Sequence, residues 1–428
     1  MSGTDGTARV ETGAQGRART DAERGSTQDG AGTEDGAGLP LEGITVVALE
    51  QAVAAPLATR HLADLGARVI KVERPGSGDF ARGYDRSVHG ESSYFVWLNR
   101  GKESVELDIK DSGDRALLDR IVAGADVFVH NLVPGAVERS ELDAATVRAR
   151  HPRLVHCSVS GYGPEGPYGR KKAYDLLIQC ESGLVSATGT PEEAAKVGIS
   201  IADIATGMYA YSGILTALLR RERTGRGAAL DVAMLDALGE WMTQPTYRAV
   251  HGGQEAPRTG ARHASIAPYG PYRVGDGGTV FLGVQNDREW AALCRQVLGR
   301  PELADDPWFV HNTERVEHDD AITAAVEDSF VGSTVEEVEA LLEGAGIANA
   351  RVRSPRGFAD HPQLAARGRW DSVGLPDGAR VGALLPPVGW GDLRYSLGDV
   401  PALGAHTAAV RAEFDGAGGH HGAQEVRT

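Results

Sequence analysis

The chain has 428 residues and a formal net charge of −15 at pH 7, which excludes a general binder of nucleic acid or of anionic membranes but not a local basic pocket for a phosphorylated ligand. Its three cysteines, Cys157, Cys180 and Cys294, are widely separated, so the sequence predicts neither a disulfide framework nor a structural zinc site. No apolar stretch is long enough to span a membrane and the N-terminus lacks a signal-peptide core, so we expect a cytoplasmic protein.

Residues 1–38 contain almost no large apolar side chain and are rich in Gly, Ala, Thr, Asp, Glu, Arg and Ser. A segment of this composition cannot offset the conformational entropy that ordering removes. We therefore predict a disordered and dispensable tail.

Beyond the tail, strand and helix patterns alternate. Residues 44–50 form a β-branched apolar run, Pro56 opens a helical pattern that ends at Gly66, and residues 68–73, RVIKVE, follow as a second strand. Strand, helix and strand over about thirty residues predict a βαβ unit, and so a parallel sheet with a right-handed crossover. The pattern continues with strands at 104–109, 126–131 and 153–159 and with helices at 112–125 and 142–150. We predict a doubly wound, Rossmann-like α/β domain at 39–229, whose ligands lie beyond the carboxyl ends of the strands.

Two loops at these strand ends each open beside an arginine. Arg74 begins the loop RPGSGD, and Arg139 follows the loop NLVPGA that starts at Asn131. Glycines let the backbone approach a ligand closely, and a guanidinium binds anionic or planar groups. Each arginine taken singly also fits a solvated surface charge, so the loops alone leave both interpretations open.

The segment that begins at Gly161 fits the dinucleotide fingerprint GxGxxG and follows a predicted strand. However, Pro164 and Pro167 fall where the phosphate-binding helix should begin and continue. We therefore do not expect a bound dinucleotide, and we interpret the loop as flexible backbone beside Asp175.

Asp175 lies between this glycine-rich loop and the apolar run Leu176–Ile178. Low-polarity neighbours weaken the solvation of a carboxylate. An aspartate before an apolar run is ordinarily a helix N-cap, and the exposed amides of a helix start also favour a bound or developing anion. The local sequence therefore leaves two interpretations of Asp175, a helix cap or a nucleophile, which can coexist.

Residues 198–223 form a long apolar helical pattern with small residues at about helical spacing, which indicates close packing in the cover of the sheet or at a subunit interface. Asp203 on this helix fits a cap, a structural ion pair or a residue that faces the site. Further strand and helix patterns predict a smaller α+β domain at 230–365, followed by a return segment and flexible end at 366–428.

The phrase YDLLIQCESGL at 174–184, followed by SATGT and by GISIADIATGMYAYSGILTALLRRERTGRGAALDVAMLDA, resembles the central signature of the class III coenzyme A transferases of the formyl-CoA transferase type. The resemblance covers most of residues 41 to about 285. It implies that Asp175 is the covalent nucleophile and that the substrates are an acyl-CoA and a small carboxylic acid. It also implies an interlaced homodimer that needs no metal or redox cofactor.

By motif position, the resemblance further implies a set of residues that contact coenzyme A. These residues are Val53, Ala54, Arg74, Leu107, Lys110, Asn131, Ala136 and Arg139. Ala55 stands where the family usually has Gly, a departure that would tighten the loop against the ligand.

Two alternatives remain. An α-methylacyl-CoA racemase resembles this fold but has a histidine directly before the aspartate of the signature, where this chain has Tyr174, paired with an acid at the position of Asp203. A non-catalytic acyl-CoA-binding protein would keep the loops without needing Asp175. The cations Arg262, His263 and Arg273 fit either a site for the second carboxylate of a dicarboxylate such as succinate or solvated surface charges.

Overall fold

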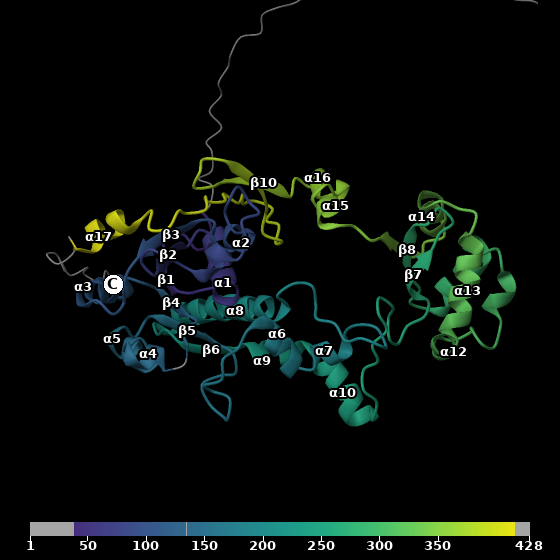
Figure 1. The fold of residues 1–428 in the computed structure, drawn as a ribbon, viewed down its shortest axis with the longest axis horizontal. Coiled ribbons are helices and arrows are strands. Elements are labelled where there is room, and N and C mark those ends of the chain that lie inside the picture. The colour runs from purple at the N-terminus through teal and green to yellow at the C-terminus, as the bar shows by residue number, and fades with distance from the viewer. Residues whose placement is uncertain (1–37, 134, 416–428) are drawn as a thin grey trace, which may run out of the picture. The chain divides into compact units, whose positions relative to one another are not determined.

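The computed structural model describes residues 38–133 and 135–415, so the predicted tail lies outside the described residues except for its last position. The described chain is built on a six-stranded sheet with the strand order β3-β2-β1-β4-β5-β6 (Figure 1). The strands are β1 (Thr45–Leu49), β2 (Arg68–Glu73), β3 (Lys102–Glu106), β4 (Val127–His130), β5 (Val155–Ser160) and β6 (Ala229–Ala233). All five neighbouring pairs run parallel, which confirms the predicted α/β class with a parallel sheet.

Helices cover both faces of this sheet. One face of the sheet, including Val46 and Val129, packs in one apolar cluster with α1 (Ala54–Asp64) and α8 (Ile201–Thr224). The other face, including Val47 and Phe128, packs with α3 (Ser112–Ala123), α5 (Ala144–Arg150) and α17 (Thr407–Asp415). Because both faces are buried, β1 and β4 are apolar at almost every position, which is why their runs could be recognised in the sequence.

The small residues of α8 are buried in the cover of the sheet. A Cβ added at Gly207 would lie 2.6 Å from the carbonyl oxygen of Ala54 and 3.0 Å from Leu57 on α1. The two helices therefore approach closely enough to need glycine at this position. α8 ends at Thr224 and is capped by Gly225, whose φ of 69° lies in the left-handed region that glycine adopts without strain.

Short helices at the carboxyl edge of the sheet were not predicted. η1 (Phe80–Gly83), α2 (Ser93–Asn99) and α4 (Ala136–Arg139) lie in the connections after β2, before β3 and after β4. The connection between β5 and β6 contains α6 (Asp175–Glu181) and α7 (Leu184–Ala187) ahead of α8, and β6 is followed by α9 (Met234–Trp241) and α10 (Thr243–Gly252). The predicted domain boundary at residue 230 falls inside β6.

A second group of elements surrounds the antiparallel strands β7 (Tyr269–Arg273), β8 (Thr279–Gly283) and β9 (Ala348–Arg351). Its apolar cluster includes Tyr272 and Trp290. The helices that contribute are α11 (Asp287–Ala292), η2 (Leu293–Val297), η3 (Pro301–Ala304), α13 (Asp319–Phe330) and α14 (Val335–Gly344), and α12 (Asn312–Glu317) precedes α13.

The C-terminal part of the described chain returns to the parallel sheet. After α15 (Pro355–Ala359), α16 (Pro362–Ala366) and the hairpin of β10 (Trp370–Gly374) and β11 (Arg380–Leu384), the chain runs along the edge strand β3. The amide of His406 donates to the Ser104 carbonyl over 3.0 Å, and the Thr407 hydroxyl accepts from the amide of Glu106 over 2.9 Å. These bonds cover backbone groups that an edge strand would otherwise expose. No helix of the described residues has the length and hydropathy that crossing a membrane requires.

Two buried histidines predict how stability depends on pH. His130 in β4 and His156 in β5 lie with ring centroids 5.1 Å apart. Burial, with a smaller contribution from His156, lowers the pKa of His130 from 6.5 to about 3. Between these two values the unfolded chain binds a proton that the folded chain does not, so stability falls as the pH falls through this window.

We expect His130→Leu to reduce the acid sensitivity of the fold. Between pH values of about 7 and 5, its unfolding free energy should fall by about 2 kcal/mol less than that of the wild type, measured by urea unfolding. The control is His251→Leu, because His251 is exposed. If the unfolding free energy fell equally in the wild type and in His130→Leu, the acid sensitivity would not come from His130.

Candidate active site

The residues predicted to contact coenzyme A follow four adjacent strands at one edge of the sheet. Val53 and Ala54 follow β1, Arg74 follows β2, Leu107 and Lys110 follow β3, and Asn131, Ala136 and Arg139 follow β4. Because the strands are parallel, their carboxyl ends meet at the same edge, and the strand order reverses between β1 and β4. The topology therefore brings the predicted residues to the edge where ligands of such sheets bind.

Asn131 connects the two strands on either side of this reversal. Its side-chain oxygen accepts from the amide of Gln51 over 3.0 Å, and its side-chain nitrogen donates to the carbonyl of Gln51 over 2.8 Å. The backbone amide and carbonyl of Gln51 are thus both hydrogen-bonded to the side chain of Asn131. Asn131 fixes the turn after β1 against the end of β4.

The side chains of the predicted set differ in what they can offer a ligand. Arg74, Lys110 and Arg139 are exposed cations. Leu107 is 2% exposed and packs in the core under the sheet, so its backbone rather than its side chain is available to a ligand. A ligand at this edge would meet three exposed cations, which suits phosphate groups.

Asp175 is the first residue of α6, and its carboxylate is held by three donors. Gln179 donates to Oδ2 over 2.7 Å, while the amides of Ala202 and Asp203 donate to Oδ1 over 2.8 and 3.3 Å. A carboxylate offers about four lone-pair sites, two on each oxygen. Both sites on Oδ1 are therefore occupied, and one site on Oδ2 remains for a further contact.

The capping role that the sequence suggested for Asp175 exists, but it serves a different helix. The N-cap position of α6 is Tyr174, whose side chain forms no cap. Ser200 precedes α8 without forming a side-chain cap either, and Asp175 supplies that cap from another segment of the chain. Its carboxylate therefore lies against the positive end of α8, where a helix favours negative charge.

Gln179 was not recognised from the sequence as a site residue. Its side chain is fully buried, and its oxygen accepts from the amide of Val197 over 2.9 Å while its nitrogen bonds Asp175. The spacing of four residues from Asp175 places both on one face of α6, which is the signal that could have identified it.

Asp203 lies beside Asp175 in the first turn of α8, and the two acids form a carboxylate pair. Asp203 is partly buried and accepts no hydrogen bond from the residues that the structure describes. Burial, with the negative charge of Asp175, raises the pKa of Asp203 to about 7. Asp203 is therefore largely protonated below a pH of about 7 and becomes ionised above it.

Aromatic side chains approach the carboxylate pair. Burial raises the pKa of Tyr84 to about 12, and the charges of Asp79 and Asp203 contribute in the same direction. Tyr84 packs edge-to-face against Tyr94 of α2, with ring centroids 5.4 Å apart. Tyr174, the residue before Asp175, is 63% exposed.

The glycine-rich loop does not form a dinucleotide site. β5 ends at Ser160, and the next helix, α6, begins only at Asp175. The segment from Gly161 onward therefore lacks the helix whose amides would bind a diphosphate, as Pro164 and Pro167 indicated. Within the described residues, no group of three metal-binding side chains occurs either.

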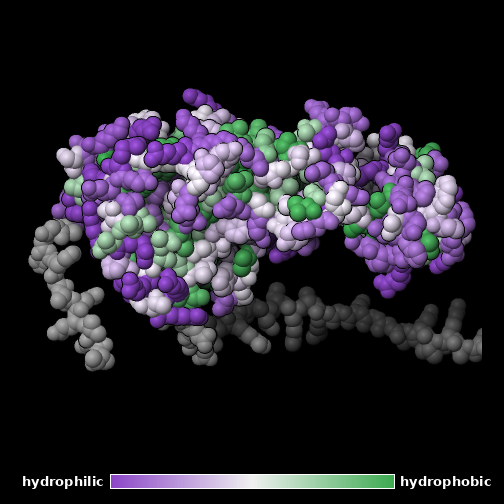
Figure 2. Space-filling view, turned by 90° about the horizontal axis from the view of Figure 1, so that it is seen from below, coloured by the Kyte–Doolittle hydropathy of each residue, from purple (hydrophilic) through white to green (hydrophobic). Residues whose placement is uncertain are grey.

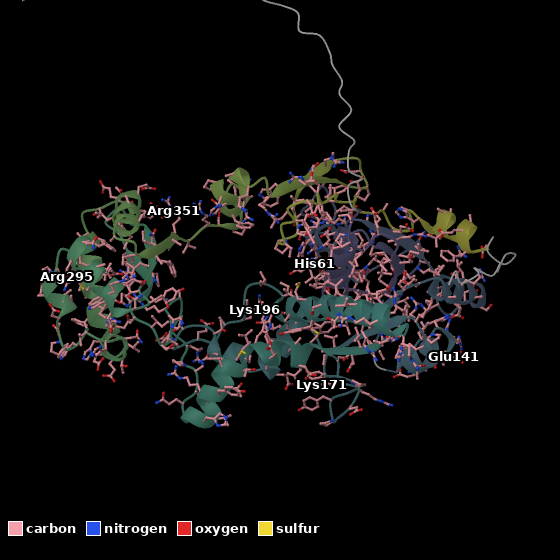
Figure 3. The ribbon with its side chains drawn as sticks, turned by 180° about the vertical axis from the view of Figure 1, so that it is seen from behind. His61, Glu141, Lys171, Lys196, Arg295 and Arg351 are labelled. Atoms are coloured by element: carbon pink, nitrogen blue, oxygen red, sulfur yellow. The ribbon has the colours of Figure 1, made fainter. Side chains whose placement is uncertain are left out.

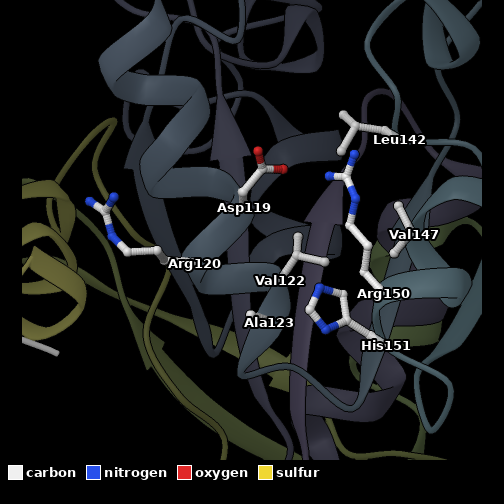
Figure 4. Close-up of a pocket in the computed structure, with 8 residues that line it drawn as sticks. All are labelled: Asp119, Arg120, Val122, Ala123, Leu142, Val147, Arg150 and His151. Atoms are coloured by element: carbon white, nitrogen blue, oxygen red, sulfur yellow. The ribbon is translucent and has the colours of Figure 1, made fainter. Parts of the chain in front are cut away.

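One cavity lies next to α6 and a second lies between α3 and α5. The first, of about 320 Å³, is lined by Tyr162, Lys171, Leu177, Cys180 and Glu181. Lys171 precedes α6, and Lys196 lies on the segment that leads to α8 (Figure 3). The other cavity, of about 210 Å³, lies between α3 and α5 and contains none of the predicted site residues (Figure 4).

Comparison with known proteins gives consistent matches over this region. A family model described as CoA-transferase family III matches residues 41–407. A succinyl-CoA:glutarate CoA-transferase of Mus musculus is 34% identical over 378 residues, which cover 87% of this chain and 86% of that protein. An acetyl-CoA:oxalate CoA-transferase of Acetobacter aceti is 36% identical over 382 residues, which cover 88% of this chain and 96% of that protein. The crystal structure of a CAIB/BAIF family protein from Brucella suis superposes with a TM-score of 0.78 at 35% identity, covering 88% of this chain and all of that one.

Proposed function

Because the chain belongs to CoA-transferase family III, whose enzymes move coenzyme A between acyl-CoAs and carboxylates, we propose that it does so through a covalent intermediate on Asp175. The observation that carries this proposal is the environment of that carboxylate. One oxygen of Asp175 accepts from two backbone amides at the start of a helix, and the other keeps a free lone-pair site.

The proposed chemistry needs only carboxylates and a thioester. The Asp175 carboxylate attacks the thioester carbonyl and displaces the coenzyme A thiolate, which leaves a mixed anhydride. The thiolate attacks the aspartyl carbonyl of this anhydride, releases the donor acid and forms an aspartyl-CoA thioester. The acceptor carboxylate repeats the two exchanges in reverse, so that a new acyl-CoA leaves and the aspartate is regenerated.

The hydrogen bonds of Asp175 suit both steps. Oδ2 has the free lone-pair site and is the oxygen that attacks, while the three donors hold the carboxylate in one orientation. Oδ1 then becomes the carbonyl oxygen of the anhydride and carries the negative charge when the thiolate attacks. The amides of Ala202 and Asp203 already lie 2.8 and 3.3 Å from it. Each amide that stays well placed would stabilise this oxyanion by about 3 kcal/mol.

Asp203 is proposed to set the charge beside this oxyanion. Its pKa is raised to about 7 by burial and by the charge of Asp175, so near neutral pH a large fraction of it is protonated. A protonated Asp203 adds no second negative charge where the oxyanion forms. An ionised Asp203 would oppose the oxyanion, because like charges a few ångströms apart repel strongly in a partly buried site.

The proposed coenzyme A site is the carboxyl edge of β1–β4. Arg74, Lys110 and Arg139 are placed to bind the nucleotide and its phosphates, because they are exposed and lie after neighbouring strands. Val53 and Ala54 line the start of α1, which packs directly against α8. A ligand bound along this edge would lead its thioester toward the start of α8.

The acyl groups that we propose are short dicarboxylates. The Mus musculus relative is a succinyl-CoA:glutarate CoA-transferase, and both acids in that name carry a second carboxylate. Of the cations suggested by the sequence, Arg262 already donates to the carbonyl of Pro271 over 3.0 Å and lies 3.6 Å from Asp319. His263 and Arg273 are exposed and are the better candidates for a second carboxylate.

We also propose that the enzyme is a homodimer. Large apolar side chains are exposed on α6, α8, α9 and α10, and Figure 2 shows hydrophobic side chains that reach the surface. The large apolar side chains exposed on these four helices are Leu176, Leu177, Met208, Tyr209, Leu219, Trp241, Tyr247 and Val250. A monomeric protein rarely exposes so many large apolar side chains on helices that contact one another. Sedimentation equilibrium should give twice the mass of one chain, and a single-chain mass would contradict the proposal.

An exchange screen tests the function. The purified enzyme is incubated with one acyl-CoA and one carboxylic acid at a time, and the coenzyme A products are separated by chromatography. We expect transfer between succinyl-CoA and dicarboxylates. An enzyme that instead exchanges the α-hydrogen of an acyl-CoA with deuterated water, without any acceptor, would be a racemase. Tyr174 argues against that outcome, because a tyrosine is a poor base where a racemase has histidine.

A further inference from the structure

A buried group of charges lies directly under the turn that follows β1. Lys71, Asp79 and Glu50 have fully buried side chains, and Lys71 lies 2.8 Å from Asp79 and 3.4 Å from Glu50. Glu50 also accepts from Lys102 over 2.7 Å. Burial opposes the charge of Lys71, but the carboxylates of Glu50 and Asp79 outweigh it and raise the pKa of Lys71. Such a group stays buried only when every charge has its partner.

Asp79 connects this group to the turn. Its Oδ2 accepts from Lys71, while its Oδ1 accepts from the amide of Ala52 over 3.0 Å and from the amide of Ala81 over 2.9 Å. Ala52 has a φ of 64°, in the left-handed region that residues other than glycine rarely adopt. A charge-assisted hydrogen bond to its amide offsets the cost of this conformation.

The turn at Ala52 contacts both the proposed coenzyme A edge and α8, the helix that carries Asp203. Ala52 and Val53 pack in one apolar cluster with Ile204, which is the neighbour of Asp203 on α8. Val53 precedes α1 at the edge proposed for coenzyme A. A change in the backbone at Ala52 would therefore displace the cleft relative to the carboxylate pair.

We propose that Asp79 is a positioning residue that holds Ala52 in the left-handed conformation and so sets the shape of the coenzyme A cleft. The inference rests on the proposed function, because it concerns the same cleft. Lys71 orients the Asp79 carboxylate, and the second oxygen of that carboxylate remains for the two amides. Asp79 does not need to touch the substrate.

The test uses two substitutions that act on the same backbone position. Asp79→Asn places an amide against Lys71 and weakens the bond to Ala52, so KM for acyl-CoA should rise about ten-fold and Tm should fall. Glycine adopts a positive φ without strain. Adding Ala52→Gly to Asp79→Asn should therefore bring KM back to within about three-fold of the wild type, while Tm stays low because Lys71 still lacks one of its two carboxylate partners.

Asp64→Asn is the matched control. Asp64 is a buried carboxylate between Arg60 and Arg100 at the far end of α1, so its loss should lower Tm and leave KM unchanged. If Asp79→Asn does not fold, Ala52→Val provides the second test, because a β-branched residue is strongly disfavoured at positive φ. Ala52→Val should raise KM with the charge group intact.

Three outcomes would overturn the inference. They are an unchanged KM in folded Asp79→Asn, an unchanged KM in Ala52→Val, and a KM that follows Tm rather than recovering with Ala52→Gly. Calorimetry of coenzyme A binding distinguishes an error in the role of Asp79 from an error in the proposed function. A wild type that binds no coenzyme A overturns both, whereas a wild type that binds and transfers while Asp79→Asn has the same KM overturns only the role of Asp79.

Discussion

Asp175→Asn is expected to abolish transfer and to prevent any covalent adduct. The substituted side chain keeps the shape of aspartate and an oxygen for the amide of Ala202, but it lacks the carboxylate that attacks the thioester. We therefore expect kcat to fall by about three orders of magnitude or more. Calorimetry should show that the variant still folds and still binds coenzyme A, because the strand-end edge is unchanged.

Peptide mass spectrometry identifies the residue that carries the adduct. Trypsin cleaves after Lys172, Lys196 and Arg220, so Asp175 and Asp203 lie on separate peptides, 173–196 and 197–220. Incubation of the wild type with acyl-CoA alone should yield a coenzyme A adduct on peptide 173–196, and hydroxylamine or the acceptor acid should release it. An adduct on peptide 197–220 would move the covalent step to Asp203.

Asp203→Asn is the matched comparison, because the two acids share one site. We expect this variant to form the adduct on the same peptide as the wild type and to retain kcat at pH 7 to within about ten-fold. An Asp203→Asn enzyme that forms no adduct while Asp175→Asn still forms one would reverse the two assignments.

The stability of Asp203→Asn provides evidence that its fold is intact. Because the pKa of Asp203 in the folded protein is raised to about 7, folding opposes its ionisation, and this carboxyl destabilises the protein as the pH rises from about 4 to 7. The substitution to asparagine removes that penalty. Asp203→Asn should therefore have a higher Tm than the wild type at a pH of about 8, measured by calorimetry.

The central strands β1 and β4 could be predicted because each is buried on both faces. β2 has the predicted bounds 68–73, although Arg68, Lys71 and Glu73 alternate with its apolar residues. β3 was predicted at 104–109 but spans Lys102–Glu106. Lys102 is buried by its contacts with Glu50 and the Pro56 carbonyl, which lie 52 and 46 positions away in the sequence, so no local pattern indicates them.

The short helices at the carboxyl edge depend on contacts that are distant in the sequence. η1 begins where the Asp79 side chain accepts from the amide of Ala81, and Asp79 is itself held by Lys71 of β2. Helices of one or two turns have too few residues for a recognisable period. Tertiary contacts therefore decide whether they form.

The location of the candidate site at one edge of the sheet could be predicted from the sequence, but its hydrogen bonds could not. The strand-end loops could be assigned to one edge because parallel strands end together. The bond between Asp175 and the amide of Ala202 joins residues 27 positions apart, and no spacing rule reaches that far. For this reason the sequence left the role of Asp203 open and associated the capping of Asp175 with the helix that it begins rather than with α8.

The rate of adduct formation should fall as the pH rises through the pKa of Asp203. Attack of the thiolate places negative charge on Oδ1 of Asp175, and an ionised Asp203 beside it opposes that charge. Burial together with the charge of Asp175 raises the pKa of Asp203 to about 7, so this opposition develops around neutral pH. In single-turnover experiments with acyl-CoA alone, the wild-type rate should be roughly ten-fold lower at a pH of about 8.5 than at about 6, as expected for a loss of about 1.4 kcal/mol in transition-state stabilisation. Asp203→Asn carries no charge at this position at any pH, so its rate should stay level over the same range. A parallel fall in Asp203→Asn would mean that the titrating group lies elsewhere, and the proposed role of Asp203 would then fail while that of Asp175 would stand.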